Sequence, residues 1–167
     1  MTPQDLVLTP KGLRFARQHW PCTIGRSGLS HTKREGDGAT PTGTHRITGF
    51  LYRPDRIARP NRWAKPIRPG DLWSDDPNDA HYNLMVRAPY AYSHESLRRA
   101  DPLYDLILLT DWNWPRAIRG YGSAIFLHRW RRPGYPTEGC IALRPDHLMR
   151  LASKLTPQTR LIVTNLE

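Results

Sequence analysis

The sequence predicts a mainly β fold, a β-sandwich with one or two short helices. Sixteen prolines and twelve glycines are spread through the 167 residues, which favours turns and irregular connections over a helical bundle. Short apolar runs lie between these turn residues, as expected for strands. The helical period of apolar residues is clear in one segment near the C-terminus.

In the first third of the chain, the predicted elements are short strands. Leu6–Leu8 and Gly12–Ala16 are expected to flank a turn, and Trp20–Ile24 is expected to form a third strand. Residues 34–43 contain three glycines and a proline and are expected to turn. His45–Tyr52 is then predicted as a further strand.

The middle of the chain has no clear period. Residues 54–83 are rich in Pro, Asp, Asn and Trp and are expected to form an irregular insert, which in a compact domain is often functional. Ser93 is expected to cap a short helix that runs to Ala100, with Leu97 facing inward. The length of the chain, residues 1–167, fits a single domain.

The last third of the chain contains the most regular patterns. Tyr104–Thr110 is a nearly continuous apolar run and is predicted as a central strand, and Ser123–His128 is predicted as another. Pro145–Leu155 is the predicted helix, because its apolar residues recur at helical spacing and proline fits the first turn. Arg160–Val163 is predicted as the closing strand.

The composition limits the possible partners without choosing one. The formal net charge of +10 is suited to nucleic acid, anionic membrane surfaces or acidic polymers. No basic segment followed by an apolar run marks a signal peptide, and no stretch is apolar for long enough to cross a membrane. The two cysteines, Cys22 and Cys140, lack the C-x-x-C spacing of a zinc or redox motif.

Cys140 and His128 are the candidate reactive pair. Cys140 follows Gly139, which allows substrate and backbone N–H groups to approach closely. A thiol needs a basic neighbour to become a nucleophile at neutral pH, and His128 ends a predicted strand twelve positions earlier. The segment between them is expected to turn the chain back and bring the two side chains together. On these residues alone, a buried core thiol and an ordinary strand-end histidine are the alternative.

Two motifs in this sequence resemble those of the L,D-transpeptidase catalytic domain (YkuD-type) family. His128, eight further residues and then Thr137-Glu138-Gly139-Cys140 resemble the family's catalytic signature. Residues 35–43, EGDGATPTG, resemble its D-G-x-T-P-x-G turn. The likeness covers roughly residues 23–163. The loop after the histidine is shorter than usual, Glu138 replaces the commoner histidine, and Ala142 replaces the usual Arg or Asn, which places the chain in a divergent branch.

The resemblance implies an L,D-transpeptidase-like β-sandwich and a cysteine acyl-enzyme that forms cross-links between peptidoglycan stem peptides at meso-diaminopimelate. Cys140 is then the nucleophile and His128 the base, and the backbone N–H groups of Cys140, Gly139 and Glu138 are expected to hold the oxyanion. A carbonyl of Ser123 or Gly122 is expected to hold the histidine. An L,D-carboxypeptidase or amidase that hydrolyses muropeptides with the same site is the alternative. The chemistry requires no metal and no organic cofactor, and carbapenems are expected to acylate Cys140.

Other residues are candidates for substrate contact. The insert supplies an aspartate and an asparagine, and the loop before Cys140 supplies arginines that can pair with carboxylates in a bidentate manner. Turn formation and a solvated charged face are the alternatives. The candidate substrate-binding residues are Asp75, Asn83, Arg129, Arg131, Tyr135, Thr137 and Glu138.

The remaining expectations concern context. Cys22 is expected to be a core thiol without a disulfide to Cys140. The family places its substrate outside the cytoplasmic membrane, so a periplasmic or wall-associated monomer is expected, with a cytoplasmic role left open by the lack of a visible signal peptide. A non-enzymatic nucleic-acid-binding β domain is the remote alternative, based on the charge and the six tryptophans. No known nucleic-acid-binding motif is present, so no nucleic-acid partner is expected.

Overall fold

The computed structural model describes residues 2–164, and these form a mainly β structure with one helix, as predicted. The main sheet has ten strands in the order β3-β2-β1-β15-β7-β12-β13-β14-β4, with β8 beside β7. Their bounds are Gln18–Trp20 (β3), Gly12–Phe15 (β2), Leu6–Thr9 (β1), Arg160–Val163 (β15), Gly43–Tyr52 (β7), Leu106–Thr110 (β12), Phe126–Arg129 (β13), Ile141–Leu143 (β14), Cys22–Thr23 (β4) and Ala64–Pro66 (β8).

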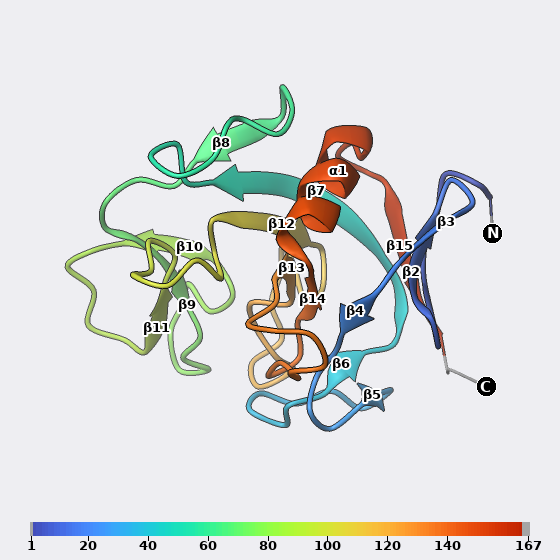
Figure 1. The fold of residues 1–167 in the computed structure, drawn as a ribbon. Coiled ribbons are helices and arrows are strands. Elements are labelled where there is room, and N and C mark those ends of the chain that lie inside the picture. The colour runs from blue at the N-terminus through green and yellow to red at the C-terminus, as the bar shows by residue number, and fades with distance from the viewer. Residues whose placement is uncertain (1, 165–167) are drawn as a thin grey trace.

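The main sheet curls strongly, and Figure 1 shows β7 as the long curved strand that links its two ends. At the far end of the sheet β4 comes back into contact with β2, so the arrangement approaches a barrel. The single helix, α1 (Pro145–Lys154), lies across β12 and β13. Leu148 and Leu151 of α1 are buried with the main core, as the helical period predicts.

Two smaller sheets complete the fold. One contains β10 (Met85–Arg87), β9 (Asp71–Ser74) and β11 (His94–Ser96), and the other contains β5 (Leu29–Ser30) and β6 (Thr40–Pro41). Figure 1 shows the β9–β11 sheet on the side of β12 away from the N-terminal strands.

Strand β12 is buried on both faces, which explains its continuous apolar run. Leu106 and Leu108 belong to the core beneath α1, whereas Ile107 belongs to a second apolar cluster with Trp73 and Phe126. Successive side chains of a strand point to opposite faces, so a strand between two cores needs apolar residues at every position. The region between β12, β13 and the β9–β11 sheet is where the candidate site lies.

Several predicted boundaries are wrong for identifiable reasons. Pro21 interrupts the predicted strand 20–24, so that Trp20 ends β3 and Cys22–Thr23 forms the separate strand β4. Residues 93–100 form no helix, because His94–Ser96 pairs as β11 with β9, although Leu97 is fully buried as expected. Residues 54–83 are not wholly irregular, since they contain β8 and β9.

Candidate active site

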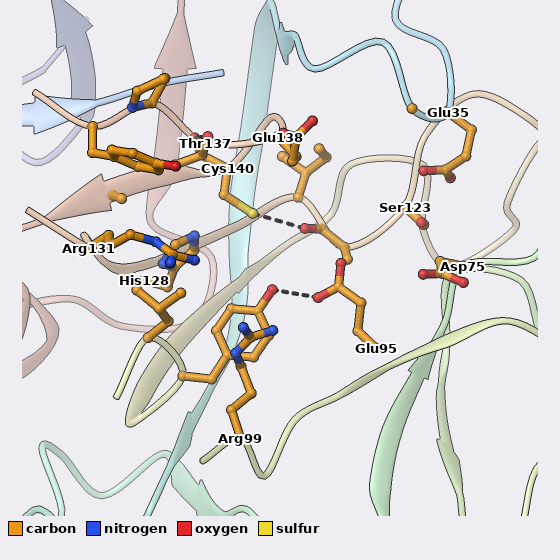
Figure 2. Close-up of a pocket in the computed structure, with 18 of the residues that line it drawn as sticks. Glu35, Asp75, Glu95, Arg99, Ser123, His128, Arg131, Thr137, Glu138 and Cys140 are labelled. Carbon is orange, nitrogen blue, oxygen red and sulfur yellow. Dashed lines mark hydrogen bonds between the residues drawn. The ribbon is translucent and has the colours of Figure 1, made fainter. Parts of the chain in front are cut away.

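A cleft of about 540 Å³ contains both Cys140 and His128. Figure 2 shows Cys140, His128 and Arg131 on one side of this cleft and Glu35, Asp75 and Ser123 on the other. The cleft is lined by Lys33, Glu35, Gly36, Asp75, Glu95, Arg99, Leu103, Tyr104, Ser123, Ala124, Ile125, His128, Arg131, Tyr135, Pro136, Thr137, Glu138, Cys140 and Ala142.

Parallel pairing of β13 and β14 brings the thiol and the imidazole to one cleft. His128 on β13 lies opposite Ala142 on β14, and Cys140 comes directly before β14. Residues two apart on a strand share a face, so Cys140 and Ala142 point to the same side as His128. The turn-back predicted from the sequence is wrong in direction, because the 130–140 segment crosses over and returns parallel to β13 instead of antiparallel.

The turn that presents Cys140 is closed by Thr137. Its hydroxyl donates to the carbonyl of Cys140 over 2.6 Å and accepts the N–H of Gly139 over 3.2 Å. Gly139 has a φ of +137°, and a Cβ atom there would lie 2.8 Å from the carbonyl oxygen of Ala39. Only glycine fits both the conformation and the space.

The upstream 35–43 motif is hydrogen-bonded to this turn. The hydroxyl of Thr40 donates to the carbonyl of Gly139 over 2.8 Å and accepts the N–H of Gly25 over 2.9 Å. Asp37 accepts the N–H of Ala39 over 2.9 Å and pairs with Lys33 over 2.5 Å, which fixes the loop that carries Thr40. The two sequence motifs therefore form one connected structure around the nucleophile.

The Cys140 thiol is held in its neutral form. It donates to the carbonyl of Ala124 over 3.1 Å, and its sulfur accepts the N–H of Phe126 over 3.3 Å. Burial raises the pKa of Cys140 to about 12, the Phe126 N–H opposes this, and the negative charge of Glu95 adds to it. Burial therefore disfavours the thiolate form of Cys140.

His128 is also neutral, and a backbone carbonyl fixes its orientation. Its Nδ1 lies 2.7 Å from the carbonyl oxygen of Arg129, so Nδ1 carries the proton and Nε2 is left as the acceptor. Burial lowers the pKa of His128 to about 4, opposed by the bond to Arg129. The expectation that Ser123 or Gly122 would hold the imidazole is wrong, because the carbonyl comes from the next residue in the chain.

Tyr104 connects this pair to the acidic part of the cleft. Its ring packs edge-on against His128, with centroids 5.4 Å apart. Its hydroxyl donates to Oε2 of Glu95 over 2.5 Å. Burial, together with the charge of Glu95, raises the pKa of Tyr104 well above its usual value, so the phenol stays protonated.

The predicted substrate-binding residues divide into two groups. Asp75, Arg131, Tyr135, Thr137 and Glu138 line the cleft. Within the cleft wall the guanidinium of Arg131 stacks over Tyr135, whereas Glu138 is largely exposed and pairs with Arg26 at its outer rim over 3.0 Å.

Asn83 and Arg129 do not line the cleft. The expectation from the sequence that these two residues contact substrate directly is therefore corrected. Asn83 is buried; its Oδ1 accepts the N–H of Ala124 and the indole N–H of Trp73, and its amide donates to the carbonyls of Trp112 and Asn113. It holds the wall of the cleft instead. Arg129 contributes its carbonyl to His128.

Sequence reasoning missed several residues of the cleft. Lys33, Glu35, Glu95, Arg99 and Tyr104 line it but were not predicted. Glu95 and Arg99 fall in the segment that was expected to be a helix, so no pattern linked them to Cys140. Cys22 lies outside this cleft and is a free thiol, as is Cys140, in agreement with the expectation of no disulfide.

A β scaffold with a thiol and a neutral imidazole on one cleft is the arrangement of thiol-dependent acyl-transfer enzymes. The sequence matches the YkuD family, the L,D-transpeptidase catalytic domain, over residues 4–163, and the chain belongs to that family. Its members are cysteine-dependent L,D-transpeptidases that act on peptidoglycan. No curated protein and no solved structure gave a match.

Proposed function

We propose that the protein is a peptidoglycan L,D-transpeptidase that forms cross-links between stem peptides at meso-diaminopimelate through an acyl-enzyme on Cys140. The observation that carries the proposal is the pairing, in one cleft, of a thiol after Gly139 with an imidazole whose Nε2 is a free acceptor. The arginines and carboxylates of the cleft are suited to the charged groups of a stem peptide.

In the acylation step, the sulfur of Cys140 forms a bond to the carbonyl carbon of the donor amide. Because burial disfavours a free thiolate, the thiol proton moves to Nε2 of His128 as that bond forms. The imidazolium then gives this proton to the departing amine as the C–N bond breaks, which leaves a thioester. The N–H of Gly139 already donates to Thr137, so the oxyanion is assigned to the N–H groups of Cys140 and Glu138.

In the second step, the acyl group moves to an acceptor. The amine of a second stem peptide attacks the thioester and loses its proton to His128. The C–S bond breaks as the new amide forms, and His128 returns the proton to the sulfur of Cys140. Attack by water in place of the amine gives the carboxypeptidase or amidase outcome with the same residues.

Treatment with a carbapenem tests the nucleophile. Intact-mass analysis should show one adduct on the wild-type protein and none on Cys140→Ala. Peptide mapping should place the adduct on Cys140, with Cys22 unmodified as the internal control. An adduct that persists on Cys140→Ala would overturn the assignment.

Incubation with purified tetrapeptide muropeptides then separates the two outcomes. Cross-linked dimers are expected for a transpeptidase, and shortened monomers alone would establish the hydrolase. The His128→Ala variant should form neither product, although its Cys140 remains present.

We propose that the protein works outside the cytoplasmic membrane, where its family typically acts and where cross-linked peptidoglycan is found. Within residues 2–164, no helix has the length and apolar character needed to span a bilayer. Fractionation of cells with an antibody to the protein tests this location.

A further inference from the structure

Three carboxylates line the cleft beside the nucleophile without a cationic partner. They belong to Glu35, Asp75 and Glu95. None of the ion pairs formed within residues 2–164 includes any of them. The hydroxyl of Tyr82 donates to Glu35 and that of Tyr104 to Glu95, and both donors are neutral.

Asp75 provides an independent observation, because one of its carboxylate oxygens lacks a hydrogen-bond donor among the described residues. Its Oδ1 is shielded from solvent and accepts no hydrogen bond from the residues that the structure describes. A carboxylate oxygen without a donor is costly, and Asp75 as a whole is only half-buried and lines the cleft, so a cation brought there would stabilise its carboxylate. Figure 2 shows Asp75 beside Ser123 and Glu35, with the Glu95 carboxylate between Asp75 and Cys140.

The neighbouring cationic side chains form salt bridges with other carboxylates. Arg99 pairs with Asp101 over 2.6 Å and Lys33 with Asp37 over 2.5 Å, although both line the cleft. Arg131 lies on the opposite side of the cleft, over the Tyr135 ring. In a protein with a net charge of +10, this wall therefore remains negative next to the reactive thiol.

Glu95 also connects this wall to the reaction. Its carboxylate accepts from Tyr104, whose ring packs on His128, and its charge disfavours ionisation of Cys140. A positive group bound against Glu95 would cancel that charge and make removal of the thiol proton easier. The same contact would place a cationic substrate beside the sulfur.

We propose that Glu35, Asp75 and Glu95 bind a primary ammonium group of the donor stem peptide, and that its contact with Glu95 makes acylation of Cys140 depend on that charge. This inference rests on the proposed function, which supplies the stem peptide as substrate. It assigns the ammonium to named residues and makes Glu95 a binding residue that acts on the nucleophile.

The first test needs no natural substrate. Cys140 is alkylated with 2-bromoethylammonium, which is cationic, and with iodoacetamide, which is neutral, and the modification is followed by peptide mapping. The rate of alkylation by the cationic reagent is divided by the rate with the neutral reagent. This ratio should be about tenfold lower for Glu95→Gln than for wild type, because one negative charge next to the thiol is lost. The amide introduced by Glu95→Gln retains an acceptor oxygen for the Tyr104 hydroxyl, so the geometry is preserved.

The matched control is Asp76→Asn, which removes the same charge from the neighbour of Asp75. Asp76 does not line the cleft, and an asparagine can still accept the N–H of Asn78 as the aspartate does. The rate ratio of this variant should equal that of wild type. An unchanged ratio in Glu95→Gln, or an equal fall in Asp76→Asn, would overturn the proposal.

The second test uses the donor stem peptide alone and measures the thioester adduct by intact mass. The free side-chain amine of the donor is compared with its N-acetylated form. Wild type should form the adduct about tenfold faster with the free amine, and Glu95→Gln should lose this preference. Equal rates in wild type would overturn the ammonium assignment. Failure of both donors would instead count against the proposed function, while the alkylation ratio would still decide the role of Glu95.

Discussion

Cys140 and His128 are both held uncharged by burial, and this has consequences for stability as well as for chemistry. The pKa of the thiol is raised and that of the imidazole is lowered, so neither group favours its charged form. Charge separation is therefore expected to occur only as substrate fills the cleft and reacts.

The first prediction concerns stability at acidic pH. The pKa of His128 is about 4 in the folded protein against 6.5 when exposed, so between these values the unfolded chain binds the proton more strongly. The free energy of unfolding should therefore fall as the pH is lowered from 6.5 to 4, by about 1.4 kcal/mol per pH unit from this group. Urea unfolding of wild type and His128→Asn across this range measures the difference in slope. Equal slopes would show that His128 is not the group responsible.

The second prediction concerns Gly139. Alanine there would need a positive φ and would place its Cβ against the carbonyl of Ala39, so Gly139→Ala should lose about 3 kcal/mol of stability and the carbapenem reaction with it. Gly120→Ala is the control, because Gly120 also has a positive φ but has no atom within 4 Å of its added Cβ. It should lose only about 1 kcal/mol. Similar losses in both variants would remove the steric argument.

At the scale of elements, the 35–43 loop and the Cys140 turn behave as one unit joined by Thr40. Thr40→Val keeps the shape but removes both hydrogen bonds of the hydroxyl, which join Gly25 to Gly139. We expect a loss of about 2 kcal/mol and slower acylation of Cys140, measured by urea unfolding and by intact mass. Thr44→Val, at an exposed position of β7, should change neither quantity.

A further prediction tests the structural role of Asn83. Asn83→Gly accepts the φ of +60° but removes four hydrogen bonds, three to residues 112–124 and one to Trp73 within its own segment. Unfolding free energy should fall by about 3 kcal/mol. Asn78→Gly, at an exposed position, should lose less than about 1 kcal/mol. A folded Asn83→Gly protein of wild-type stability that binds substrate poorly would restore the substrate-contact interpretation.

Elements defined by their own pattern were predictable from the sequence. Helix α1 and strand β15 follow from apolar spacing, and both occur almost where predicted. Strand β11 was not predictable, because pairing with β9 overrides the helical tendency of residues 93–100. Likewise β13 begins at Phe126 instead of Ser123, because Ala124 has a φ of +51° and leaves the strand conformation.

The candidate site divides in the same way. Cys140 and His128 could be found because they lie in one short motif, and both line the cleft. Glu95 and Tyr104 could not, because only the folding of the β9–β11 region brings them beside the thiol. Asn83 was misjudged because the sequence does not show whether an asparagine is buried. A buried amide that forms all its hydrogen bonds cannot be told from a polar loop residue by sequence alone.

At the scale of the whole molecule, the charge of +10 is expected to draw the protein to acidic polymers. Binding to isolated peptidoglycan sacculi should weaken markedly between about 0.05 and 0.5 M NaCl, because salt screens charge attraction over this range. Co-sedimentation measures the bound fraction. Sacculi with amidated carboxyl groups should bind less protein at low salt, and equal binding would show that the carboxyl groups are not what attracts it.

The crossover between β13 and β14 is a loop without a helix, and its residues 131 and 135–138 face the cleft. Among the residues that the structure describes, its start is held by the hydrogen bond from the N–H of Trp130 to the carbonyl of Leu143, and its end by those between Thr137 and residues 24 and 26. We therefore expect that the middle of this loop can be exchanged to alter which substrates enter the cleft, while Cys140 and His128 keep their places. In this fold the loop that would determine selectivity is separate from the strand residues that hold the reactive atoms.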